Sequence, residues 1–231
     1  MDNKELKLAA ANIRKGIVTA VHAAKSGHPG GSLSAADMYT FLYFEQMNID
    51  PANPKMENRD RFVLSKGHTA PGLYSTLANR GYFPVDELVT LRKLGSRLQG
   101  HPCMNETPGV DMSSGSLGQG LSVAVGMALS AKLDNKDYRV YTLLGDGEIQ
   151  EGQIWEASMF AGANNLSNLT VIVDNNGLQI DGKVDRTAYQ HRYHDIRPQK
   201  VAQRGDIGKE CIHGLLLFGY KSTIIRLHFR G

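Results

Sequence analysis

The feature that most constrains the fold is a strand–helix–strand pattern in the second half of the chain. Two short apolar runs, at 139–144 and 169–173, enclose a segment with helical periodicity at 150–163. Strands that are apolar throughout are typical of a parallel sheet covered on both faces, because a solvent-facing side would show alternating polar residues. The pattern therefore predicts an α/β fold in which a parallel sheet is flanked by helices.

Further elements extend this pattern towards the N-terminus. The run RFVLS at 61–65 suits a third buried strand, and helical patterns are present at 4–25, 34–46, 70–80, 86–94 and 117–132. We expect Ser34 to cap the second of these helices and Gly81 to end the third. A chain of 231 residues is long enough for one such domain with a real core.

Charge divides the chain near residue 184. Residues 183–231 contain ten lysines and arginines against four acids, whereas residues 1–182 contain sixteen against nineteen. We therefore expect residues 1–184 to form the domain and residues 185–231 to be an atypical basic tail. Nucleic-acid binding is the alternative use of such a tail, but interleaved aromatic residues on a recognisable module are missing, and we expect no nucleic-acid partner.

Two absences in the sequence bear on the compartment. No segment approaches the roughly 20 apolar residues of a membrane helix, and the N-terminus lacks the apolar core of a signal peptide. We therefore expect a cytoplasmic protein without membrane contact. Cys103 and Cys211 have no metal-ligand spacing and are expected to be free thiols.

The strongest candidate site is the segment GDGEIQEG at 145–152, where Asp146 follows a buried strand and precedes a helix. A helix N-terminus attracts anions such as phosphate, and a carboxylate beside a phosphate requires a cation between them. The next strand ends in DNNG, and ends of neighbouring parallel strands lie about 4.8 Å apart. Asn176 and a carbonyl near Leu178 can complete an all-oxygen set for Mg²⁺ or Ca²⁺. The alternative is a pair of ordinary turns.

Three histidines lie in glycine-flanked loops: His28, His68 and His101. Neutral imidazoles can donate to phosphate or sugar hydroxyls, or transfer protons near pH 7. A structural role and a zinc site made only of histidines are the alternatives. The loop SSGSLGQG at 113–120 runs into a helix rich in small residues, which suits close backbone approach to a flat ligand.

Six motifs in this order resemble the series found in transketolases, over roughly residues 4–183. They are SGHPGG at 26–31, RFVLSKGH at 61–68, QGHP at 99–102, SSGSLGQG at 113–120, GDGEIQEG at 145–152 and DNNGLQIDG at 174–182. The resemblance implies a thiamine-diphosphate-binding fold of the diphosphate-binding (PP) type. The deoxyxylulose-phosphate synthases are the second choice, because they do not share the SGHPGG form. An inactive fragment that binds only cofactor or partner is the third.

The resemblance also implies the contacts to thiamine diphosphate and its metal ion. Asp146, Asn176 and the carbonyl of Leu178 would hold Mg²⁺ or Ca²⁺ on the diphosphate. His68 and the N–H of Gly147 would contact the diphosphate. Gly115 and Leu117 would lie near the rings of the cofactor. The catalytic residues implied are His28 and His101, which would hold hydroxyls of the donor sugar, and Glu151, which would join a carboxylate network across a subunit interface.

The activity implied is transfer of a two-carbon ketol unit from a ketose, or its phosphate, to an aldose or its phosphate. Transketolases also need a pyrimidine-binding domain, for which this sequence has no counterpart. We therefore expect a partner chain, the C-terminal transketolase subunit, in an α2β2 hetero-tetramer, and no activity without it. After residue 184 the resemblance stops, and a frameshifted or truncated end of family sequence is the leading explanation of the tail.

Overall fold

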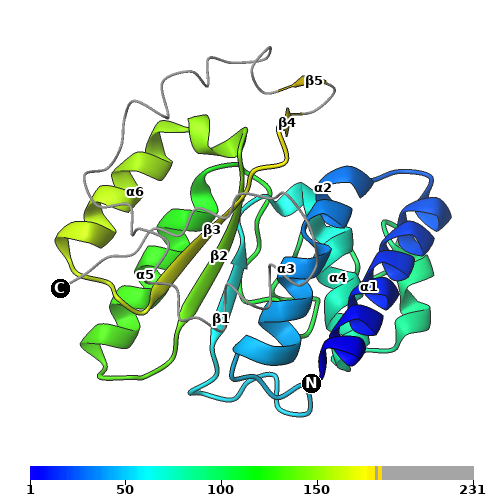
Figure 1. The fold of residues 1–231 in the computed structure, drawn as a ribbon, viewed down its shortest axis with the longest axis horizontal. Coiled ribbons are helices and arrows are strands. Elements are labelled where there is room, and N and C mark those ends of the chain that lie inside the picture. The colour runs from blue at the N-terminus through cyan, green and yellow to red at the C-terminus, as the bar shows by residue number, and fades with distance from the viewer. Residues whose placement is uncertain (180–181, 184–231) are drawn as a thin grey trace.

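The computed structural model describes residues 1–179 and 182–183, and its centre is a parallel sheet with strand order β1-β2-β3. The strands are β1 (Arg61–Leu64), β2 (Val140–Gly145) and β3 (Leu169–Asp174) (Figure 1). β2 pairs in parallel with both neighbours, which confirms the predicted α/β fold. A short antiparallel pair follows β3, made of β4 (Leu178–Gln179) and β5 (Gly182–Lys183).

Helices cover both faces of this sheet (Figure 1). One face is covered by α5 (Gln119–Leu133) and α6 (Gly152–Ala163). The other is covered by α3 (Ala36–Phe41) and α4 (Ala70–Arg80), and α1 (Asn3–Ala24) packs outside them. The short helix α2 (Pro29–Ser34) lies against α4. Within the described ranges, no helix has both the length and the apolarity needed to cross a membrane.

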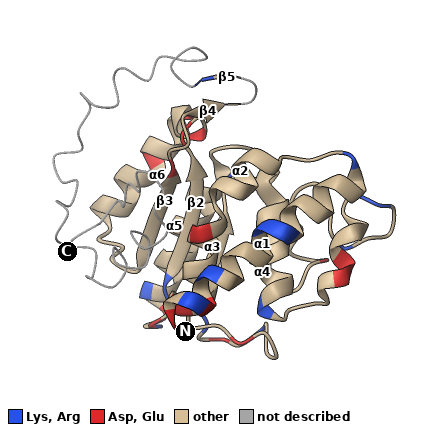
Figure 2. Cartoon of the chain, turned by 45° about the vertical axis from the view of Figure 1, so that its right-hand side comes forward, with Lys and Arg blue, Asp and Glu red and all other residues tan. Residues whose placement is uncertain are grey.

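The two ends of the sheet carry different charged residues (Figure 2). Lysines, arginines and acids lie together at the amino ends of the strands, near the N-terminus of the chain. At the carboxyl ends, between α6 and β4, the coloured segments are mainly acidic. Ligands of open α/β sheets bind at the carboxyl ends of the strands, so this second end is where a site is expected.

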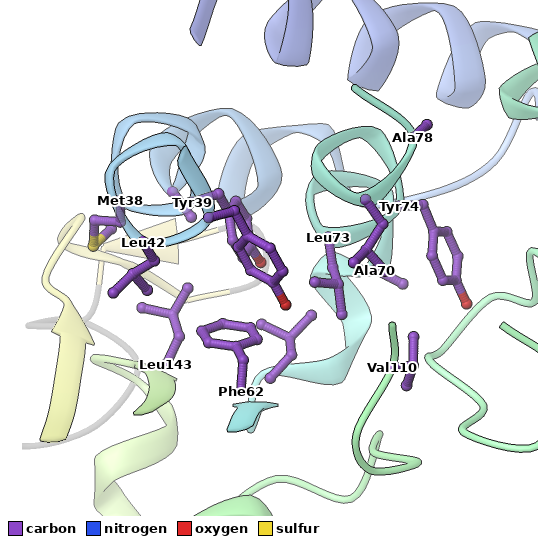
Figure 3. Close-up of a cluster of buried hydrophobic side chains, with 14 of the residues drawn as sticks. Met38, Tyr39, Leu42, Phe62, Ala70, Leu73, Tyr74, Ala78, Val110 and Leu143 are labelled. Carbon is purple, nitrogen blue, oxygen red and sulfur yellow. The ribbon is translucent and has the colours of Figure 1, made fainter. Parts of the chain in front are cut away.

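Alternating side chains of the strands fill the two halves of the core. On one face, Phe62 and Leu143 pack with Met38, Tyr39 and Leu42 of the first helical layer (Figure 3). The neighbouring strand residues point to the opposite face, where they pack with α5 and α6. Because both faces are covered by helices, successive residues of β2 and β3 are nearly all buried. This burial explains why the strands are apolar throughout.

Several helix boundaries differ from the predictions. The expected helix at 34–46 is instead α2, α3 and a π-helical turn at Leu42–Gln46. The cap predicted at Ser34 is wrong, because Ser34 ends α2 and its Oγ donates to Asp174 at 2.8 Å. The segment at 86–94 is a 3-10 helix, Val85–Thr90, rather than an α-helix. Gly81 ends α4 with a φ of 101°, as predicted.

The start of α5 is decisive for the site. The helix begins at Gln119 rather than at residue 117, because Gly118 has a φ of 87°, which is left-handed. The loop before the helix therefore extends as far as Gly118.

Cys103 is a free cysteine, as expected. Cys211 and the proposed tail at 185–231 lie outside the described residues.

Candidate functional site

The tips of β2 and β3 lie side by side, as the sequence predicts. Gly145 is opposite Asp174 in the register, and the next residue along β2, Asp146, donates its backbone N–H to the Asp174 carbonyl at 3.3 Å. Both carboxyl groups are buried. Two acidic side chains thus follow one another on adjacent strands at the carboxyl end of the sheet.

The carboxylate of Asp146 is only 2% exposed and accepts hydrogen bonds from backbone N–H groups. The donors are Gly147 at 3.0 Å and Gly177 at 2.6 Å. Among residues 1–179 and 182–183, no lysine, arginine or histidine forms an ion pair with it. Burial raises the pKa of Asp146, and the two backbone donors offset part of that rise. A cation placed beside it would favour the charged form.

The carboxylate of Asp174, on the neighbouring strand, is fully paired. It is 0% exposed and forms an ion pair with Lys66, whose Nζ lies 2.5 Å from Oδ2. Its other oxygen accepts from Ser34 Oγ at 2.8 Å. Lys66 Nζ also donates to the Gly31 carbonyl at 3.2 Å, which ties α2, directly after His28, to the end of β1. Asp174 therefore has a structural cation of its own.

The loop at 176–178 brings the other predicted metal ligands to the tip of β2. Gly177 donates its backbone N–H to the Asp146 carboxylate, and Gly177 lies between Asn176 and Leu178 in the sequence. Asn176 is half-buried; its Oδ1 accepts from Leu178 N at 2.9 Å and its Nδ2 donates to Asp174 at 3.3 Å. Leu178 is 60% exposed. In the described part of the chain, no three His, Cys, Asp or Glu side chains are grouped as metal ligands.

The three histidines predicted in loops come together at the same end of the sheet, although His68 lies in a 3-10 helix, Gly67–Thr69. The rings of His28 and His68 are 5.1 Å apart and nearly perpendicular. Burial, with smaller contributions from His28, Lys66 and His101, lowers the pKa of His68 to about 4. Burial also lowers the pKa of His101, with contributions from Arg92 and His28. Both imidazoles are therefore neutral at pH 7, so each has one N–H donor and one acceptor nitrogen.

Glycines allow the histidine loops to touch the Ser/Gly loop at 113–118. A Cβ added at Gly67 would lie 2.7 Å from the backbone N of Gly115, which places the two loops in direct contact. Gly115 itself has a φ of 153°, and a Cβ there would lie 3.0 Å from the ring of His101. Any larger residue at either position would push these loops apart. The Oγ of Ser114 in this loop is buried and has no hydrogen-bond partner among the described residues.

Leu117 and Glu151 lie together on the outer side of this loop. Both side chains are exposed, Leu117 by 37%. A Cβ at Gly118 would lie 2.9 Å from the Cβ of Glu151, and Gln153 Nε2 donates to the Leu117 carbonyl at 3.1 Å. Glu151 precedes α6 and makes no capping hydrogen bond with its side chain. Its carboxylate thus lies at the surface, in contrast to the buried acids of the strand tips.

Reasoning from sequence missed three charged residues at this end of the sheet. Lys66 appeared only as part of a motif, although a lysine directly after an apolar strand is a signal for a buried ion pair. Glu148 is 3% exposed, and burial raises its pKa, while Ser65 Oγ and the N–H of Gly118 oppose the rise. Arg92 donates to Ser26 Oγ at 2.9 Å, and its charge helps to lower the pKa of His101.

Comparison with known proteins identifies the family. Residues 6–208 match the model of the transketolase thiamine diphosphate binding domain. The chain is 50% identical over 178 residues to the 6-deoxy-6-sulfo-D-fructose transketolase subunit SqwG of Clostridium sp. (strain MSTE9). It is 46% identical over 185 residues to one of the subunits of the apulose-4-phosphate transketolase of Phocaeicola vulgatus. These alignments cover 77% and 80% of this chain.

A similar fold occurs in solved structures. A transketolase mutant from Pichia stipitis superposes with a TM-score of 0.76 at 40% identity, covering 82% of this chain and 30% of that one. The matches also cover only part of the curated relatives, 65% of the Clostridium protein and 66% of the Phocaeicola protein. The family match ends at residue 208, beyond the domain boundary expected at 184.

Proposed function

The chain belongs to the transketolase family, through its thiamine diphosphate binding domain, and we propose that it holds the diphosphate of that cofactor through a divalent cation between β2 and β3. One observation carries the proposal: the buried carboxylate of Asp146 has no cationic partner in the described residues. A buried carboxylate without a cation costs free energy, and a bound Mg²⁺ or Ca²⁺ would remove that cost.

The residues at the strand tips fit such a cation. Asp146 offers a carboxylate, and Asn176 and the Leu178 carbonyl offer neutral oxygens from the loop hydrogen-bonded to it. Within the described residues, the Oδ1 of Asn176 accepts from Leu178 N alone, which leaves it one lone pair for a metal. Zinc prefers nitrogen and sulfur ligands, whereas this all-oxygen set suits Mg²⁺ or Ca²⁺.

The surrounding loops supply the other contacts that we propose. The N–H of Gly147, which is shared with Asp146 Oδ1, and neutral His68 donate to the diphosphate, while the backbone at Gly115 and the side chain of Leu117 lie along the rings of the cofactor. Neutral His101 can donate to one sugar hydroxyl and accept from another, and the ring of His28 lies beside that of His68 at the same place. These imidazoles hold the sugar and move protons at its hydroxyl oxygens.

The reaction that we propose is two-carbon ketol transfer between an acidic ketose and an aldose. Thiamine diphosphate, when bound, supplies the reactive carbon, and the protein positions both reactants. The relatives act, by name, on a sulfonated fructose and on a phosphorylated apulose. We accordingly propose phosphorylated or similarly acidic sugars, such as those of the pentose phosphate pathway, in the cytoplasm.

A partner chain is part of the proposal. Both relatives are named as subunits, and the Pichia transketolase chain is more than three times as long as the stretch that it shares with this chain. We propose an α2β2 assembly with a C-terminal transketolase subunit, in which the exposed carboxylate of Glu151 meets the partner. The pyrimidine-binding domain would come from that subunit.

Two measurements test the proposed function. Calorimetric titration with thiamine diphosphate, with and without Mg²⁺, is expected to show binding that requires the metal. Xylulose 5-phosphate and an aldose are expected to react only when a partner chain is present. Metal-independent binding would contradict the cation site, and turnover by this chain alone would contradict the need for a partner.

The end of the chain requires a separate test. We propose a domain boundary at residue 184 and a frameshifted or truncated origin for residues 185–231, on the basis of the change in charge and periodicity. Translation of the parent DNA in its other frames after codon 184 is expected to recover family-like sequence. The family match already runs to residue 208 in the present frame. If no other frame gives family-like sequence after codon 184, the frameshift is contradicted.

A further inference from the structure

Glu148 is a buried acid at the carboxyl end of the sheet that none of the roles above uses. It opens the 3-10 turn Glu148–Gln150 between β2 and α6 and is 3% exposed. Its Oε1 accepts from Ser65 Oγ at 2.5 Å and from Gly118 N at 2.8 Å. Its Oε2 accepts from Gly145 N at 3.0 Å. One carboxylate thus satisfies three donors from three separate segments.

Each donor is close in sequence to a residue that the proposed function assigns to the cofactor. The serine that binds Oε1 lies three residues before His68, and Gly118 directly follows Leu117. Gly145 directly precedes Asp146. The carboxylate therefore connects the segment that leads to His68, the Ser/Gly loop at 113–118 and the tip of β2. A shift of any one segment changes the length of a hydrogen bond to the same group.

The three donors explain why the acid stays in place although it is buried without an ion pair in the described residues. A carboxylate only accepts hydrogen bonds and has about four lone-pair sites, so it can serve all three donors. A glutamine has one carbonyl oxygen and one NH₂ group. Whichever way it is turned, its NH₂ faces a backbone N–H, either that of Gly118 or that of Gly145, and this N–H loses its acceptor.

We propose that Glu148 is a positioning residue, which sets the spacing between the segment that leads to His68, the Ser/Gly loop and Asp146. This spacing in turn sets the affinity for metal-bound thiamine diphosphate. This inference rests on the proposed function. Glu148 itself is not assigned a contact with the cofactor, because it is buried and each of its oxygens already accepts from a protein donor. It acts by holding three segments in the arrangement that binds the diphosphate.

The test compares Glu148→Gln with wild type in the full chain, at a temperature well below unfolding. We expect Mg²⁺-dependent affinity for thiamine diphosphate to fall at least about tenfold, which is about 1.4 kcal/mol. Amide hydrogen exchange at Gly118 and Gly145 is expected to become faster in the same variant. Trp155, the only tryptophan, donates to the Ile149 carbonyl at 3.0 Å, so its emission reports locally on the turn.

Two further variants make the test specific. Ser65→Ala removes one donor and keeps the carboxylate, so a smaller loss of affinity is expected; it also serves if Glu148→Gln does not fold. Glu156→Gln changes an exposed acid of α6 and is expected to leave affinity and exchange unchanged.

The outcomes separate the two proposals. If the wild-type chain does not bind thiamine diphosphate with Mg²⁺, the proposed function fails and this inference fails with it. If wild type binds and Glu148→Gln binds equally well, only the positioning role is contradicted. Lower stability with unchanged affinity of the folded protein would show a merely structural acid and would also contradict it.

Discussion

The two ends of the sheet hold buried carboxylates in different ways. At the amino end, Asp111 forms an ion pair with Arg59 and accepts the backbone N–H of Phe62 at 2.7 Å. Asp60 accepts from Asn48 N at 2.9 Å and Arg139 N at 2.7 Å. These acids fasten loops to the first residues of the strands, and arginines lie close to them.

At the carboxyl end, one acid is treated in the same way and another is not. Asp174 is paired with Lys66, but among the described residues Asp146 receives backbone donors alone, and burial raises its pKa. Neutral histidines and close-packed glycines surround this end. The buried acids of the amino end thus fasten loops to the sheet, whereas at the carboxyl end Asp146 has no cation among the described residues, as the proposed metal site requires.

The largest expected effect on stability comes from removing the ion pair between Arg59 and Asp111 at the amino end of the sheet. Arg59→Met leaves the carboxylate of Asp111, whose side chain is 3% exposed, without its cation. Removing one partner of a buried pair costs about 3–5 kcal/mol, which chemical denaturation can measure. Lys55→Met, at an exposed lysine, is the matched control and should change little. Equal stability of the two variants would remove the structural role given to this end.

A smaller effect is expected where α5 crosses the tip of β1. A Cβ at Gly120 would lie 2.5 Å from the Cα of Ser65, whereas one at Gly126 would meet nothing within 4 Å. Gly120→Ala should therefore cost about 1–3 kcal/mol of unfolding free energy through overpacking. Gly126→Ala in the same helix should gain up to about 1 kcal/mol. If both substitutions stabilise the protein, the close contact at the carboxyl end is wrong.

The pH dependence of stability tests the neutral histidines. The folded pKa of His68 is about 4, below the unfolded value of 6.5, so below pH 6.5 the unfolded state binds a proton that the folded state does not. Stability should fall between pH 6.5 and pH 4, by at most about 1.4 kcal/mol per pH unit. His68→Gln should flatten this slope in denaturation series, and His22→Gln, at an exposed position, should not. The same slope in all three proteins would exclude a buried neutral His68.

The smallest effect on stability is expected at Asp146. Asn in its place keeps an acceptor for Gly177 N–H, loses the one for Gly147 N–H, and removes the cost of a buried charge. We expect Asp146→Asn to change the unfolding free energy by no more than about 1 kcal/mol in metal-free buffer. A loss as large as that of Arg59→Met would mean that both ends are structural.

Much of the fold could be predicted because apolar runs and turn residues act locally. The strands at 61–65, 139–144 and 169–173 and the end of α4 at Gly81 follow directly from such patterns. Ser34 was predicted wrongly because its hydroxyl binds Asp174, 140 residues away, rather than the backbone of its own helix. A sequence pattern cannot show which of two possible partners a hydroxyl takes.

The candidate site was predicted in outline for the same reason. Strand ends in a parallel sheet meet at one edge, so the proximity of Asp146 to the loop at 176–178 could be inferred. The roles of Lys66 and Glu148 could not, because both depend on contacts between loops that are distant in sequence.

The most direct measurement is the Mg²⁺-dependent affinity for thiamine diphosphate of wild type, Asp146→Asn and the exposed control Asp137→Asn. We predict at least about a 100-fold loss for Asp146→Asn, since losing a group that merely supports a metal ligand already costs about 10–100-fold in metal affinity. Asp137→Asn should bind like wild type. Unchanged affinity in Asp146→Asn would show that the unpaired carboxylate at the tip of β2 does not hold the cation.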